Sequence, residues 1–324
     1  MTGALRRSAG IVGMVAILLF FAVSLPDTFL TLRNWLNISQ QISMLAVVAV
    51  TMTVVMAMGD FDLSVGSMAS LSGVVAATAF LQGWPIPVAL GLSLAVGLLG
   101  GLFNGVMVAV VGILPFVATL ATLTVFSGLA FLVSDGRTIF GRDIPSAFSD
   151  FARSGLPLSS GDGPALVLPN LTLVALGVAV VVWVVLEQTT YGRRLYALGG
   201  NTEAARLAGL PVRALRLSAY AFTGVGAAIA GMMYASRVAS ANPTQGDGLM
   251  LTAIASVFLG MTLTRDGSPR VFATLAGVLV LGVLDNGLTQ MRVDSYVREV
   301  LVGAIILIAV GMSALGRSGA LRRS

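Results

Sequence analysis

Two aspartates, Asp60 and Asp62, stand in the short break between two long apolar runs, and they are the first candidates for chemistry. A pair of carboxylates can relay protons, hold an ion or form the catalytic pair of an intramembrane aspartyl protease, but the Gly-x-Gly-Asp motif of such a protease is absent here. Because a charge is costly in hydrocarbon, each carboxylate must face water, a partner group or the protein interior. We therefore favour a structural role at the end of a span, with Asp62 capping the next helix, over a proton-relay or substrate-binding role.

A few uncharged polar residues lie inside apolar runs and are candidates for a translocation path or for packing, together with Asp62: Asn104, Asn286, Thr119 and Thr122. Buried amides in membranes usually find partners on neighbouring helices, and a threonine hydroxyl can bond to the preceding helical turn. A hydroxyl-rich solute could use the same groups in passing. We favour the structural role for the two asparagines. Gly97, Gly101 and Gly105 recur every four residues, which indicates a close-packing stripe.

Three residue types that carry much of enzyme chemistry are missing from the chain, which has no Cys, no His and no Lys. Without Cys there is no disulfide or Cys-ligated metal, and without His there is no Ser-His dyad or HExxH site. Without Lys there is no Walker A motif. We therefore expect no enzyme activity and no metal or cofactor held by this chain, so that energy from a nucleotide must come through a partner.

The composition is that of an all-α polytopic membrane protein. Of the 324 residues, 56% are hydrophobic and 10% charged, with a mean hydropathy of +0.95, values far outside the soluble range. The net charge of +5 comes from arginines at span ends and in loops, which reflects membrane topology and does not indicate nucleic acid. The pattern predicts ten spans, some close to the length a bilayer requires, at residues 11–25, 42–58, 63–81, 88–113, 115–133, 166–186, 217–234, 249–263, 271–288 and 296–315.

An even number of spans places both termini on one side of the membrane. Terminal arginines make that side cytoplasmic by the positive-inside rule; they are Arg6, Arg7, Arg317, Arg322 and Arg323. The first run reads as a retained span and not as a signal peptide. Residues 135–165 are expected to form an external loop, and residues 1–324 a single transmembrane domain.

The stretch from about 188 to 216 is the long polar island in the second half of the chain, and it also falls on the cytoplasmic side. It holds a candidate N-cap at Asn201, an acid at Glu203 that suits the first turn, and a stop at Gly209 followed by Pro211. A short capped helix is therefore predicted, and we expect a partner protein to grip it; the alternative is an ordinary arginine-rich loop. The residues assigned to this contact are Asn201, Thr202, Glu203, Ala204, Ala205, Arg206, Leu207 and Gly209.

A weak internal repeat relates the two halves of the chain. The motif from Gly101 to Gly105 resembles the one from Gly282 to Gly287, and a similar offset aligns Gly66 with Gly248. With five spans in each half, the copies would have opposite orientations, as in the inverted repeats of many transporters.

Three stretches carry a family resemblance: GDFDLSVGSMASLSG at 59–73, GRRLYALGGNTEAARLAGL at 192–210, and NPTQGDGLMLTAIASVFLG at 242–260, followed by LGVLDNGL. They resemble the sugar-importer permeases of the ABC superfamily, of the ribose, xylose, arabinose and galactose type, within the branched-chain amino acid permease superfamily. The resemblance implies a type II importer-like fold of about ten spans. It also implies that residues 201–209 form the coupling helix that docks into a groove on the ATPase.

The chain departs from this family pattern in places. The family usually has Gly-Gly-Ile-Asp-Leu-Ser where this chain has GDFDLS, so that Asp62 matches and Asp60 is extra. Where many sugar permeases have Glu-Leu-Asp, this chain has Met250, Leu251 and Thr252, and the usual Gly-Gly is Gly260 and Met261. These differences leave the sugar open.

The resemblance implies the membrane-spanning permease subunit of an ATP-driven importer for a monosaccharide or related polyol, in the inner membrane of a bacterium. ATP and magnesium would be used by the partner ATPase. Other implied partners are a periplasmic or lipid-anchored sugar-binding protein facing residues 242–248 and 135–165, a second permease copy or close homologue, and membrane lipids. Three alternatives stay open: a branched-chain amino acid or nucleoside permease of the same superfamily, an ion-coupled secondary transporter that uses Asp60 and Asp62, and a purely structural membrane protein.

Overall fold

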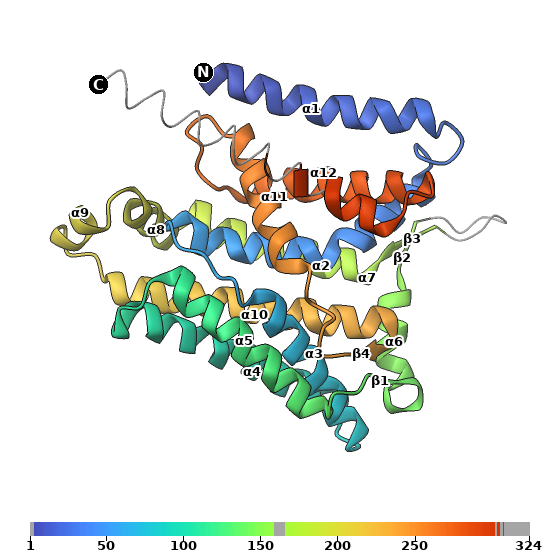
Figure 1. The fold of residues 1–324 in the computed structure, drawn as a ribbon, viewed down its shortest axis with the longest axis horizontal. Coiled ribbons are helices and arrows are strands. Elements are labelled where there is room, and N and C mark those ends of the chain that lie inside the picture. Colours follow the sequence, from blue (N-terminus) through green and yellow to red (C-terminus); the bar gives the residue numbers. More distant parts are fainter. Residues whose placement is uncertain (1–2, 159–165, 302, 305–306, 308–324) are drawn as a thin grey trace. The chain divides into compact units, whose positions relative to one another are not determined.

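The computed structural model describes the chain except for residues 1–2, 159–165, 302, 305–306 and 308–324, and it is predominantly helical (Figure 1). Some of its helices are long and apolar enough to cross a membrane: Leu32–Ala57, Ile86–Val111, Pro115–Ser134, Asn170–Gln188, Val212–Val238 and Val271–Gln290. Shorter apolar helices cover Gly10–Ser24, Val65–Leu81 and Leu249–Leu263. These helices correspond to the first nine predicted spans. The tenth, at 296–315, falls mostly outside the described residues.

The chain divides into two compact units. The first comprises Met1–Ile42 and Leu251–Ser324, and the second comprises Ser43–Met250. In the first unit, α1 (Gly3–Ser24) packs on α12 (Val271–Gln290) beside the start of α2 (Leu32–Ala57), while α11 (Leu249–Leu263) begins at the boundary between the units. Phe21, Phe29 and Leu284 belong to the apolar core of this unit.

The second unit is organised around α10 (Val212–Val238), which packs along α3 (Val65–Leu81) and α4 (Ile86–Val106). The predicted glycine stripe of α4 meets α10 directly. A Cβ at Gly101 would lie 2.3 Å from the carbonyl oxygen of Tyr220, and one at Gly97 would lie 2.5 Å from that of Gly224. A Cβ at Gly105 would lie 2.9 Å from the Cα of Leu217. The close-packing role of the stripe is confirmed, and the two helices run antiparallel.

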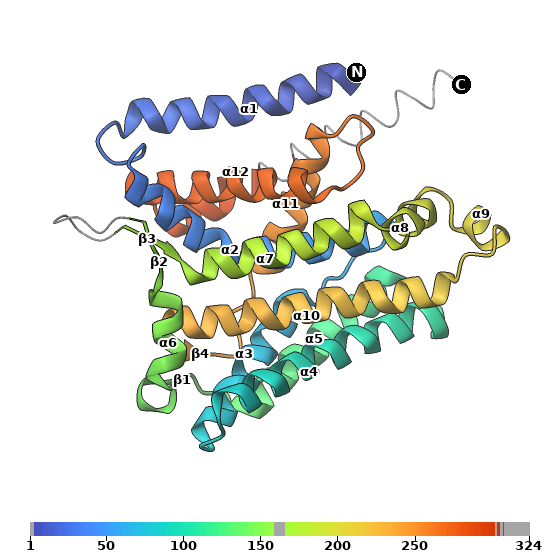
Figure 2. The same ribbon diagram turned by 180° about the vertical axis from the view of Figure 1, so that it is seen from behind.

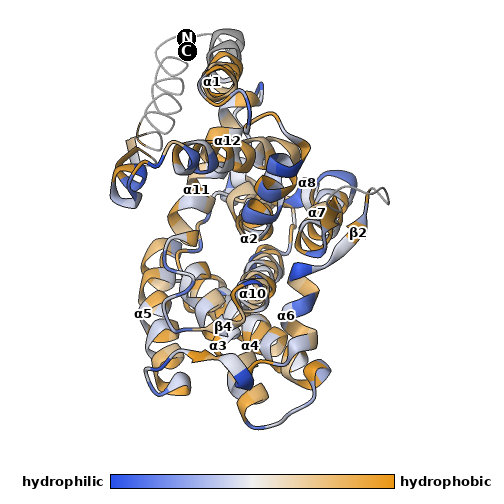
Figure 3. Ribbon diagram, turned by 90° about the vertical axis from the view of Figure 1, so that its right-hand side faces the viewer, coloured by the Kyte–Doolittle hydropathy of each residue, from blue (hydrophilic) through white to orange (hydrophobic). Residues whose placement is uncertain are grey.

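Beyond α4, the chain continues through η1 (Met107–Val111) into α5 (Pro115–Ser134). Large apolar side chains on these helices are exposed, among them Leu99, Phe116 and Leu120. Figure 3 shows the corresponding hydrophobic colour over α4 and α5. An exposed apolar face of this kind suits lipid or another membrane-embedded subunit.

The predicted external loop at 135–165 contains ordered elements. Strand β1 (Ile139–Phe140) pairs antiparallel with β4 (Ser240–Ala241), and β2 (Gly155–Pro157) pairs with β3 (Val167–Pro169). Between them, η2 (Gly141–Asp143) leads to α6 (Ser146–Arg153). The ring centroids of Phe148 in α6 and Phe80 in α3 are 5.0 Å apart. The backbone carbonyl of Phe148 accepts a hydrogen bond from the Ser236 hydroxyl. Figure 2 shows these elements at one end of α10 and the polar island at the other.

Several span boundaries differ from the sequence prediction, among them both ends of the seventh span, where α10 covers Val212–Val238 and not 217–234. Helix α2 begins at Leu32, ten residues before the expected 42, because its polar side chains find partners: Asn34 donates to the Phe29 carbonyl at 3.0 Å and Gln41 donates to Asp285. The sixth span begins at Asn170, where α7 (Asn170–Trp183) starts, and not at 166, because β3 precedes it. It ends in η3 (Val184–Gln188).

Candidate functional site

The polar island folds as two short helices, α8 (Thr190–Gly200) and α9 (Thr202–Leu207). The Asn201 side-chain oxygen accepts a hydrogen bond from the Ala204 backbone N–H at 3.0 Å, which satisfies one of the donors that a helix start leaves unpaired. The predicted helix and its N-cap are therefore confirmed.

The other end of α9 is closed by the predicted glycine. Gly209 has a φ of +79°, and its N–H donates to the Arg206 carbonyl at 3.0 Å while the Leu210 N–H donates to that of Ala205 at 3.1 Å. This pair of bonds is the Schellman motif, which requires one residue in the left-handed backbone conformation. Glycine adopts that conformation without steric strain. The helix is thus closed at both ends by its own sequence.

The α9 side chains mostly point to solvent. Leu207 is 79% exposed and Ala205 is buried, and Glu203 and Arg206 form an ion pair at 2.7 Å on the outer face. Thr202 and Ala204 are also exposed. An apolar side chain so exposed beside a charged pair can contact a partner protein, although the docking role itself stays a prediction.

Helix α8 rests directly on the end of α2. A Cβ at Gly199 would lie 2.3 Å from the Ala57 carbonyl oxygen and 3.1 Å from the Met58 Cα. The residue that follows Met58, Gly59, has a φ of +84°. The island therefore touches the break between α2 and α3 backbone to backbone.

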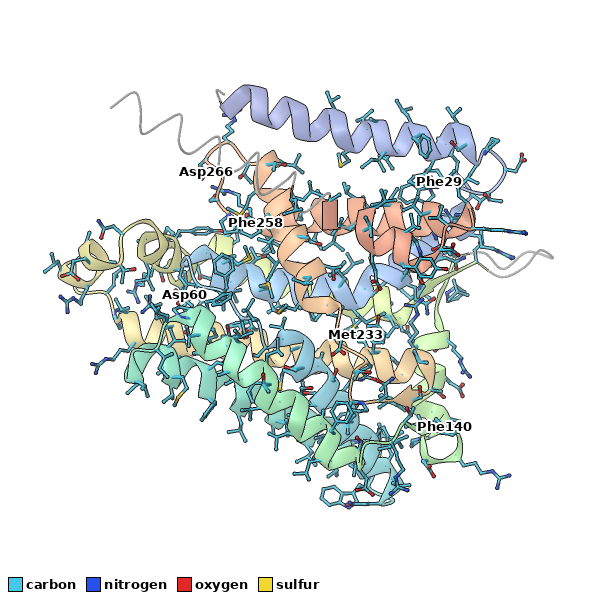
Figure 4. The ribbon with its side chains drawn as sticks, in the orientation of Figure 1. Phe29, Asp60, Phe140, Met233, Phe258 and Asp266 are labelled. Carbon is cyan, nitrogen blue, oxygen red and sulfur yellow. The ribbon has the colours of Figure 1, made fainter. Side chains whose placement is uncertain are left out.

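Asp60, labelled in Figure 4, lies within that break and forms a largely buried ion pair with Arg216 at the start of α10. The Nε–Oδ2 distance is 3.1 Å, and a weaker Nη2–Oδ1 contact measures 3.5 Å. Burial raises the pKa of Asp60 to about 6, while the charge of Arg216 acts in the opposite direction. The Tyr220 hydroxyl donates to the Phe61 carbonyl at 3.2 Å, so α10 holds this segment at two points.

Asp62 lies deeper and is surrounded by donors. Its Oδ1 accepts from the Ser64 backbone N–H at 3.0 Å and from the Ser64 hydroxyl at 2.7 Å, and its Oδ2 accepts from Thr223 at 2.8 Å. Asn104 donates to the Ser64 hydroxyl at 2.8 Å and lies 3.5 Å from Asp62 Oδ1. The N-cap position of α3 belongs to Ser64, which corrects the expectation that Asp62 would cap the helix itself. Asp62 instead ties α3, α4 and α10 together.

The other candidate path residues are bonded locally. Thr119 donates to the Pro115 carbonyl at 2.8 Å and Thr122 to that of Thr119 at 3.2 Å, the helical-turn bonding that suits a structural role. Asn286, in the first unit, accepts from Gln290 at 2.7 Å. Within the second unit, the structure thus joins Asn104 with Asp62, whereas the Thr119 and Thr122 hydroxyls bond within α5.

Sequence reasoning missed three partners on α10: Arg216, Tyr220 and Thr223. They are spaced i, i+4 and i+7, which places them on one face of a helix. That spacing is the sequence signal of a polar face on this helix, but it does not say which segment the face meets.

The polar side chains therefore bind helices together or project from one end. Among the described residues, no group of three or more possible ligands could hold a metal ion. The long apolar helices are those of a multi-pass membrane protein. The model of the family described as branched-chain amino acid transport system / permease component matches residues 34–310, and the chain belongs to this family.

Individual relatives are similar in sequence to this chain along most of their length. The ribose import permease protein RbsC of Bacillus subtilis (strain 168) is 36% identical over 95% of this chain and 92% of its own. The xylose transport system permease protein XylH of Escherichia coli (strain K12) is 31% identical over 94% of this chain and 90% of its own. A solved structure of a candidate metal-chelate type ABC transporter in an inward-facing conformation shares 13% identity with a TM-score of 0.53, covering 92% of this chain and 97% of that one. That last likeness concerns the fold alone.

Proposed function

We propose that this chain is the membrane-spanning permease subunit of an ATP-driven ABC importer for a monosaccharide or related polyol. The observation that carries the proposal is the match of 36% identity to a ribose import permease along 95% of the chain. The exposed, capped α9 supplies the feature such a subunit needs, because a permease without ATPase residues must receive its energy through a partner.

In this proposal α9 docks on the ATPase and α8 passes the displacement inward. A rigid capped helix transmits a push that a flexible loop would absorb. The push would reach the α2–α3 break through the backbone contact at Gly199 and through the Asp60–Arg216 ion pair. From there the Asp62 cross-link connects to α3, α4 and α10. Movement of these helices would change which side of the membrane the solute path faces.

Further parts of the proposal concern assembly and topology. The permease works as a pair, both termini are cytoplasmic, and the ten predicted spans form one membrane domain with an inverted five-plus-five repeat. The end of α10 that carries β1, β4 and α6 faces the external binding protein. ATP and magnesium are held by the partner ATPase.

The ion-coupled alternative needs a carboxylate that is free to take and release an ion. Asp60 is instead paired with Arg216, and Asp62 accepts bonds from Ser64 and Thr223. These contacts favour a structural role for both. A branched-chain amino acid or nucleoside substrate remains the alternative within the family, and competition by unlabelled amino acids, nucleosides and sugars in an uptake assay would separate them.

The test is affinity purification from mild detergent followed by reconstitution. We expect an ABC ATPase to co-purify, and proteoliposomes supplied with the binding protein and internal ATP to take up ribose, xylose or a related sugar. Uptake that persists without any ATPase, given only a proton or sodium gradient, would contradict the proposal.

A further inference from the structure

The segment that follows α10 turns back into the helix bundle of the second unit. The Gln245 side chain donates a hydrogen bond to the carbonyl of Gly231 at 3.3 Å. Gly231 lies seven residues before the C-terminal end of α10, which is about 10 Å along the helix axis. Next to it, the Gly246 N–H donates to the Ser70 hydroxyl at 2.8 Å, and a Cβ at Gly66 would lie 2.6 Å from the Gly246 carbonyl oxygen. Gly66 lies one helical turn before the point where α3 contacts Gly231. Gly246, which touches Gly66, therefore lies about 15 Å from the C-terminal end of α10, measured along the helix axis.

The sequence predicts that this stretch faces the binding protein, and that contact stays a prediction; the structure adds that the segment turns back along α3. Figure 1 shows the chain leaving β4 and running back toward the middle of α3 before α11 begins. The glycines at 66 and 246 permit this because their backbones touch with no side chain between them.

Non-helical backbone at such a depth must be buried in protein or must line water. Here the backbone is largely satisfied from within, since Asn242 Oδ1 accepts from the Thr244 N–H and hydroxyl, both at 3.0 Å, and the Asp247 N–H donates to the Thr244 carbonyl at 3.1 Å. The side chains of Thr244 and Asp247 are exposed. Among the residues that the structure describes, the Asp247 carboxylate meets no cation or hydrogen-bond donor.

An exposed carboxylate well inside a membrane-crossing bundle is costly unless it faces water. It is also a strong acceptor for hydroxyl groups, because hydrogen bonds to a charged group are the stronger ones. The Thr244 hydroxyl, which donates to Asn242, keeps its lone pairs for a second donor. Both side chains thus offer acceptors to a neutral molecule rich in hydroxyl groups.

We propose that the re-entrant segment, residues 242–248, lines the solute path and that Thr244 and Asp247 bind a neutral polyhydroxylated solute there. This inference rests on the proposed transport function and assigns residues to its path. The solute donates hydroxyl hydrogens to Asp247 and Thr244 as it passes, and the polar contacts are few enough to let it leave.

The absence of native cysteine makes the test direct. Thr244→Cys and Asp247→Cys would be labelled in membranes with an impermeant methanethiosulfonate reagent, with and without an excess of ribose, xylose or other pentoses, hexoses and polyols. Leu120→Cys on the exposed apolar face of α5 is the matched negative control, and Arg142→Cys in η2 is the positive control. We expect both path positions to react faster than Leu120→Cys, and at least one sugar to slow them several-fold.

Labelling at both path positions no faster than at Leu120→Cys overturns the water-lined path, and labelling that no sugar slows overturns solute binding. If a cysteine variant does not fold, Asp247→Asn provides the second measurement. We expect it to raise the KM for uptake about tenfold, since a hydrogen bond to a charged group contributes about 1.5 kcal/mol or more, and an unchanged KM overturns the role of Asp247. The labelling needs no ATPase, so its result is distinct from that of ATP-driven uptake.

Discussion

The exposed helix α9 and the buried cluster around Asp60 and Asp62 are two polar regions of the same unit, and their bonds differ in reach. In α9 every polar bond is local, as between Asn201 and Ala204 or Glu203 and Arg206. In the buried cluster, the bond from Thr223 to Asp62 joins residues 161 positions apart. The first region keeps its shape by itself and presents it to solvent, whereas the second holds separate helices together. Changes in the cluster should therefore cost stability, and changes in α9 should cost association with a partner.

The largest loss of stability is expected from Asp62→Leu. The change leaves the donors of Ser64 and Thr223 without their acceptor in a buried site, and breaking a buried charged network costs about 3 kcal/mol. Thermal unfolding in detergent, followed by size-exclusion chromatography, measures it. Asp62→Asn keeps an acceptor and should lose less. Equal unfolding midpoints for wild type and Asp62→Leu would show that the cluster does not hold the helices.

A smaller loss, about 1–3 kcal/mol, is expected from Gly101→Ala, because overpacking forces α4 away from α10. The new Cβ would meet the Tyr220 carbonyl oxygen at 2.3 Å. Gly128→Ala on α5 is the matched control, since nothing lies within 4 Å of its Cβ. The control should gain slightly in stability because alanine favours helix. If both variants behave alike, the close contact between α4 and α10 is not what stabilises this region.

The smallest effect on stability, and the largest on association, is expected in α9. Gly209→Pro fixes φ near −65° where the native value is +79°, so the C-terminal cap is lost from an exposed helix. Glu203→Arg reverses a charge on its outer face. Both variants should insert and unfold like wild type but lose uptake and co-purifying ATPase. Gly209→Asn, which tolerates a positive φ, should retain both; normal ATPase recovery with Gly209→Pro and Glu203→Arg would count against docking.

The same difference in reach explains what the sequence could predict. The cap at Asn201, the stop at Gly209 and the stripe at Gly97 to Gly105 depend on neighbours within one helix or on a regular spacing, and the structure confirms each. The spans were placed because apolar length is a local property. The ABC-type fold followed from the family resemblance and not from these local signals.

Non-local contacts were harder to predict. Nothing near Asp60 in the sequence points to Arg216, which is 156 residues away. The early start of α2 depends on Gln41 meeting Asp285 on α12. The inward course of residues 242–248 depends on glycines in two distant segments that touch only after folding. Each requires knowledge of which helices are neighbours, and periodicity within one stretch does not supply it.

The position of α9 on the cytoplasmic side, in contact with the ATPase, is the claim on which the account depends. Leu207→Cys would be the only cysteine in the chain and would lie at a position that is 79% exposed. Labelling by an impermeant maleimide therefore reports on which side of the membrane this position lies and whether the ATPase covers it. We predict labelling in inside-out vesicles stripped of the ATPase, protection when the ATPase is added back, and no labelling in intact cells. Labelling from outside intact cells, or no protection by the ATPase, would contradict the account.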